Sequence, residues 1–102
     1  MAVTICVGDE QHDIPADDAA TLAEQLRLYA DGFRGEISDP AAARNLADEI
    51  GETLARKREG PIRVDDLASL DALHTVLNSI VHEVGPAMRL YSAVVGARRR
   101  AA

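Results

Sequence analysis

The sequence is poor in aromatic residues and in cysteine. It has no tryptophan, one phenylalanine and two tyrosines, so the core must be built from aliphatic side chains and alanine. So few rings also argue against a surface that stacks nucleic-acid bases on aromatic side chains. The single cysteine, Cys6, excludes a disulfide bond within the chain.

Long apolar runs and glycine-rich loops are also missing. No stretch approaches the roughly 20 apolar residues of a membrane-spanning helix, and the start of the chain lacks the layout of a signal peptide. The seven glycines are scattered, so there is no Gly-x-Gly-x-x-Gly or Walker-type loop to hold phosphates. We therefore expect a cytoplasmic protein with no bound nucleotide, other cofactor or metal, and no membrane contact.

Acidic residues dominate the charge. The 102 residues carry a formal net charge of -6, which disfavours general binding to nucleic acids and anionic membranes. With 47% hydrophobic and 27% charged residues, the composition is that of a folded globular protein, and the length predicts a single domain over residues 1–102. The abundance of alanine and the preference for arginine over lysine suggest a GC-rich bacterial source.

The N-terminal residues predict a β-hairpin. Val3 to Val7 alternates β-branched residues on one face with Thr4 and Cys6 on the other. The segment 8–11 has turn chemistry, and His12 to Ile14 can return antiparallel to the first strand. A third short strand is expected at 61–64, most simply beside this hairpin.

Four helices are expected after the hairpin. Apolar residues recur at helical spacing over Pro15–Ala30, and Asp39 followed by Pro40 is a strong start signal for a second helix that ends near 56–60. Asp65 or Asp66 can cap a third helix, and Gly85-Pro86 separates it from a fourth over about 86–99. The third helix is expected to face the core with Leu67, Leu70, Leu73, Val76, Leu77, Ile80, Val81 and Val84.

These elements together predict an α+β fold. Their order is ββα-α-βαα, with a small antiparallel sheet of two or three strands whose one face is covered by about four helices.

A polar cluster along the third helix is the first candidate for chemistry. Asp71, His74, Asn78 and His82 follow one another at spacings of three and four, which brings their side chains together. The two histidines lack the spacing of a zinc-protease motif, and no neighbouring cysteine completes a ligand set. We interpret His74 as a boundary residue and the others as part of a solvated face.

Cys6 is the second candidate, since an activated lone cysteine can act as a nucleophile. His12 could lie across the hairpin from it and serve as a base. Its position within a strand favours a small buried hydrophobic residue instead. A small-molecule or enzymatic site between sheet and helices, built from His12, Cys6 or His74, is therefore kept as an alternative function.

Clusters of charge at helix ends are explained by the helix dipole. The pairs 17–18 and 65–66 place two aspartates each at expected helix starts, where negative charge is stabilising. Arg98, Arg99 and Arg100 stand at the opposite end of the fourth helix, where cations are stabilising for the same reason. A nucleic-acid-associated regulator that uses this arginine tail is a second alternative.

The fourth helix is apolar over well over half of its circumference. A helix of this kind is either buried between layers or presents a second face to another chain, and full burial is hard to arrange in a small domain. We therefore expect a homodimer in which the off-stripe Leu28 also takes part. The expected interface residues are Leu28, Met88, Leu90, Tyr91, Val94 and Val95. The favoured function is a non-enzymatic interaction or regulatory protein, with a homodimeric or heterologous protein partner.

Overall fold

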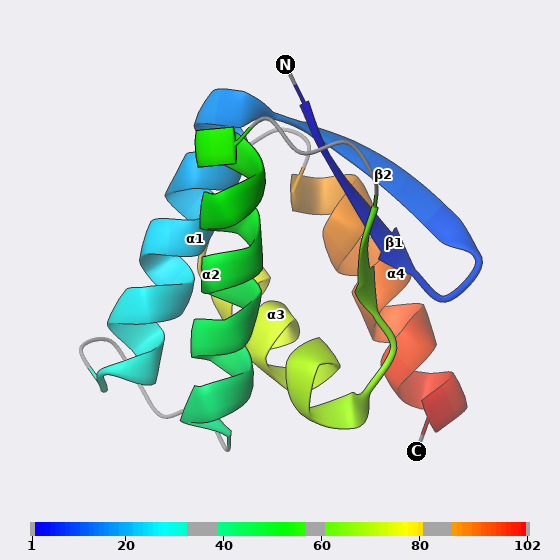
Figure 1. Cartoon of the computed structure of the whole chain (residues 1–102). Helices are drawn as coiled ribbons and strands as arrows, with labels where there is room; N and C mark the ends of the chain where they lie inside the picture. Colours follow the sequence, from blue (N-terminus) through cyan, green and yellow to red (C-terminus); the bar gives the residue numbers. More distant parts are fainter. Residues whose placement is uncertain (1, 33–38, 57–60, 81–86, 102) are drawn as a thin grey trace.

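The structure is a computed structural model that describes residues 2–32, 39–56, 61–80 and 87–101. Its elements are β1 (Ala2–Val7), β2 (Glu10–Pro15), α1 (Ala16–Ala30), α2 (Pro40–Arg56), β3 (Ile62–Val64), α3 (Leu67–Ile80) and α4 (Ala87–Ala101) (Figure 1). The α+β class and the order ββα-α-βαα are as predicted. Phe33, His82 and the Gly85-Pro86 break lie outside the described residues.

The hairpin forms where its sequence predicts it. β1 and β2 pair antiparallel in a register that places Ile5 opposite His12 and Cys6 opposite Gln11. Gly8 has a φ of 60°, which glycine adopts at little cost, and it opens the short turn between the strands.

The sheet is mixed, which corrects the expectation of a wholly antiparallel one. β3 lies beside β1 on the side away from β2, and it runs parallel to β1, with Ile5 opposite Ile62 and Val7 opposite Val64. β3 runs parallel to β1 because α1 and α2, which connect the hairpin to β3, lie side by side in opposite directions (Figure 1). The chain thus returns to the end of the sheet at which β1 starts, and β3 follows the direction of β1.

One face of the sheet carries the core. The inward side chains of Val3, Ile5 and Val7 are completely buried, and helices α1, α2 and α4 contact β1. The outward positions are half-buried or exposed and mostly polar: Thr4, Cys6, Gln11, Asp13 and Arg63.

Two arginines tie α1 to α2. Arg27 of α1 donates to the carbonyl oxygen of Ala47 and lies 3.5 Å from an Asp48 carboxylate oxygen. Arg44 of α2 donates in the reverse direction, to the carbonyl oxygen of Ala30 and to the Asp31 carboxylate. These exposed pairs stabilise by at most about 1 kcal/mol each, and both lie where the last turn of α1 meets the first half of α2.

Helix α4 is enclosed by more than one neighbour. It packs against α3 and also against β1 and β2, so its apolar residues face two directions within the same chain. Leu90, Ala93, Val94 and Ala97 all belong to the core cluster that the other elements share.

The described helices include none that is both long enough and apolar enough to cross a membrane.

Candidate functional site

The polar residues singled out on α3 lie against α4 rather than forming a ligand set. The His74 ring stacks on the Tyr91 ring, with ring centroids 5.2 Å apart and the planes 27° from parallel. The Tyr91 hydroxyl donates to the Asn78 side-chain oxygen at 3.3 Å, and Asp71 forms an ion pair with Arg98. Helix spacing thus aligns these α3 side chains as predicted, and α4 supplies their partners.

The Tyr91 hydroxyl lies between two side chains of α3. It donates to the Asn78 side-chain oxygen, and it lies 3.4 Å from His74 Nε2, where the ring tautomer decides which group donates.

The surroundings of His74 favour its neutral form. Burial lowers the pKa of the imidazole, and the positive charge of Arg98 lowers it further, whereas Asp71 acts in the opposite direction. The ring is therefore uncharged at neutral pH.

Each of the two helices also places an apolar side chain next to these polar residues. Leu67 precedes Asp71 by four residues and so lies on the same side of α3, and its side chain is 49% exposed. Val95 stands between Tyr91 and Arg98 at helical spacing on α4 and is half-buried. We call this surface the α3–α4 face: Leu67, Asp71, His74, Asn78, Tyr91, Val95 and Arg98.

Leu67 is a position that the sequence reading placed wrongly. Its apolar spacing predicts a core position, but among the described residues it is the one large hydrophobic side chain that is exposed. The sequence contains a signal for this exposure. The residues four, seven and eleven positions after Leu67, which share its side of the helix, are the polar Asp71, His74 and Asn78.

The six residues predicted as an interface divide into separate groups. Leu90 and Val94 are completely buried in the core of their own chain, which corrects their assignment to an exposed surface. The wide apolar arc of α4 had suggested a partner, but α3 and the sheet cover much of it. Tyr91 and Val95 lie on the α3–α4 face, Leu28 is half-buried on α1, and the Met88 side chain lies outside the described residues.

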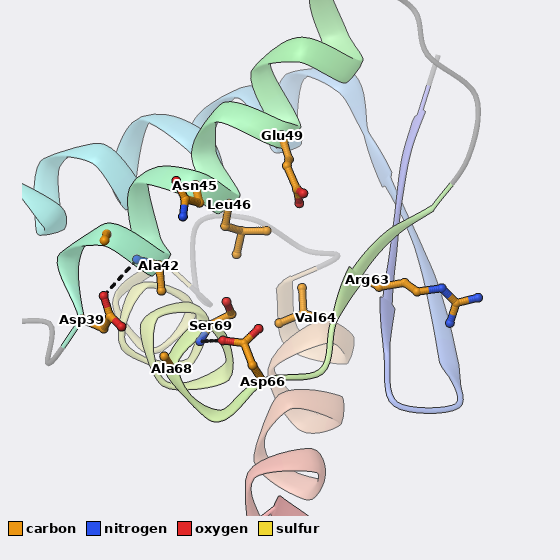
Figure 2. A pocket seen from close by; sticks show the side chains of 11 residues that line it. Asp39, Ala42, Asn45, Leu46, Glu49, Arg63, Val64, Asp66, Ala68 and Ser69 are labelled. Carbon is orange, nitrogen blue, oxygen red and sulfur yellow. Dashed lines mark hydrogen bonds between the residues drawn. The ribbon is translucent and has the colours of Figure 1, made fainter.

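A groove of about 380 Å³ lies between α2, β3 and the start of α3 (Figure 2). Asp39 and Asp66 at its edge accept hydrogen bonds from the backbone N–H groups of Ala42 and Ser69, at 3.1 and 3.0 Å. The Ser69 bond lowers the pKa of Asp66 against the opposing effect of burial. These two carboxylates cap helices α2 and α3, as the sequence predicts for Asp39 and for one of the pair 65–66.

The proposed partners of a reactive thiol do not converge. His12 is paired with Ile5 and therefore shares the inward face of the sheet, whereas Cys6 is directed to the outward face. His74 belongs to the α3–α4 face. The hypothesis of a base across the hairpin from Cys6 is thus wrong by one residue of register, which reverses the face of a strand side chain.

Two of the three tail arginines are in contact with their own chain. Arg98 pairs with Asp71, and the Arg100 guanidinium lies over the hairpin turn, where a Cβ added at Gly8 would be 3.2 Å from it. Arg99 is exposed. The tail thus contributes to packing as well as to charge.

The described residues include no group of three or more histidine, cysteine or acidic side chains placed to hold a metal ion. Comparison with protein-family models, with curated proteins and with solved structures gave no match.

Proposed function

We propose that this chain is a small non-enzymatic interaction protein of regulatory type that acts as a homodimer through the α3–α4 face. The observation that carries the proposal is Leu67, a large apolar side chain that is 49% exposed and lies one helical turn before Asp71 on the same side of α3. Exposed apolar side chains that gather beside a polar rim are typical of protein interfaces.

Charge favours a second copy as the occupant of this face. Two molecules with a net charge of -6 repel one another overall, so contact is least costly where the local charge is balanced. Asp71 and Arg98 provide this balance on the α3–α4 face, each with about 35% of its side chain exposed. A two-fold axis that passes beside this pair would place each carboxylate near the guanidinium of the other copy, which supports a second copy as the partner.

The test is the substitution Leu67→Glu. Position 67 is the first residue of α3, where a negative side chain interacts favourably with the helix dipole, so the variant should fold. In the dimer, the same change would place two carboxylates in an apolar contact and should weaken association by at least tenfold, about 1.4 kcal/mol. Light scattering after size exclusion measures the mass against the 10.9 kDa of one chain.

Ala20→Glu is the matched control, because it adds the same charge at an exposed position of α1. It should leave the dimer intact. A mass of one chain for the unmodified protein up to about 1 mM, where even weak complexes form, would contradict the proposal. Equal weakening by the two variants would show that the contact lies elsewhere.

A further inference from the structure

We infer that protonation of His74 dissociates the homodimer, so that the α3–α4 face responds to acidity. The inference rests on the proposed function, because it concerns the regulation of that same face. It starts from the position of the imidazole, which is stacked on Tyr91 near the middle of the face and lies between Leu67 toward one end of α3 and Asn78 toward the other.

The charged groups around His74 favour release of its proton. Arg98 approaches from α4, and Asp71 stands one turn earlier on α3, already paired with Arg98. Nε2 of the ring lies 3.4 Å from the Tyr91 hydroxyl, which is longer than a typical hydrogen bond. A second proton would place an imidazolium near the Arg98 guanidinium, whose effect Asp71 opposes.

Formation of the dimer should disfavour the protonated form of His74 further. Covering the face with a second copy removes water from both His74 rings, and loss of water disfavours the charged form of each. A two-fold axis also brings the two protonated rings into one interface, where their like charges repel. The dimer therefore binds fewer protons than two separate chains, and a fall in pH must shift the equilibrium toward the monomer.

The dissociation constant measured by sedimentation equilibrium tests the inference. Between about pH 7.5 and about pH 5.5 it should rise roughly tenfold for the unmodified chain, because the two His74 rings, whose pKa is lowered from 6.5, take up protons as the pH falls below that value. His74→Gln should respond less than twofold, because glutamine does not titrate in this range. His12→Gln removes a histidine of the sheet and should keep the full response.

An NMR titration supplies a second measurement that does not depend on a variant. Linkage requires the pKa of the His74 ring to be lower in concentrated, dimeric protein than in dilute, monomeric protein. Equal values in the two samples would overturn the inference.

The failures of the two proposals are distinguishable. A single-chain mass at about pH 7.5, where histidine is neutral, would refute the dimer itself. A stable dimer whose dissociation constant is the same at both pH values would refute only the role of His74. Retention of the full response by a dimeric His74→Gln variant would also refute that role, because another group would then be responsible.

Discussion

His74 makes the stability of the monomer depend on pH, separately from any association. The pKa of the ring is lowered below its ordinary value of 6.5, chiefly by burial, so the unfolded chain binds a proton more readily than the folded one. The stabilisation is therefore complete above pH 6.5 and is lost as the pH falls through the folded-state pKa.

Urea unfolding of dilute, monomeric protein measures this dependence. The free energy of unfolding should decrease between about pH 7 and about pH 5, and the decrease should be smaller for His74→Gln. Each protein is compared with itself at the two pH values. The constant loss of unfolding free energy that comes from removing the His74–Tyr91 contact therefore cancels. Identical slopes for the two proteins would contradict the role of His74.

Sequence reasoning located several of these residues but not their partners. The spacing of Asp71, His74 and Asn78 predicted that they lie together, and they do. Nothing in the sequence shows that Arg98 and Tyr91 approach them, because that contact depends on how α4 crosses α3. Cys6 and His12 show the same limit, since a shift of one residue in hairpin register decides which face each occupies.

Helix starts illustrate what is predictable among the secondary-structure elements. Asp39 and Pro40 mark the start of α2 with chemistry that is entirely local, and the structure confirms it. The direction of β3 was not predictable in this way. It depends on the packing of α1 and α2, which returns the chain to one particular end of the sheet.

The cap of α2 gives a prediction about element stability. Asp39→Ala removes the acceptor for the Ala42 N–H group and should lower the free energy of unfolding by about 0.5–2 kcal/mol. Asp39→Asn retains a side-chain oxygen that can accept the same hydrogen bond, so its loss of unfolding free energy should be a small fraction of the loss for Asp39→Ala. Chemical denaturation of the three proteins distinguishes the variants, and an equal loss for alanine and asparagine would argue against a capping role.

The whole molecule depends on β1, which is the central strand of the sheet. Ile5 is completely buried, has β2 and β3 as its neighbours and belongs to the core cluster. Ile5→Ala should therefore cost about 2–5 kcal/mol, which is a large part of the roughly 5–15 kcal/mol that stabilises a domain. Thermal and urea unfolding measure the loss.

Thr4→Ala is the matched control on the same strand. Its side chain is directed to the outward face, where the hydroxyl donates to Asp13 at 2.8 Å in an exposed bond. We expect a loss below about 1 kcal/mol. Similar losses at positions 4 and 5 would contradict the assignment of the two sheet faces.

The place of β1 between its two partners also has a kinetic consequence. Its pairing with β2 closes only a short turn, whereas its pairing with β3 joins Ile5 to Ile62 across most of the chain. Contacts between residues so distant in sequence form late, because the connecting segment must first lose its conformational freedom. The hairpin can therefore form before the three-stranded sheet, which is completed only after α1, α2 and β3 have been synthesised. The edge of β1 that pairs with β3 thus stays unpaired in the nascent chain until Val64 has been synthesised, and an unpaired strand edge is a site to which another chain can add.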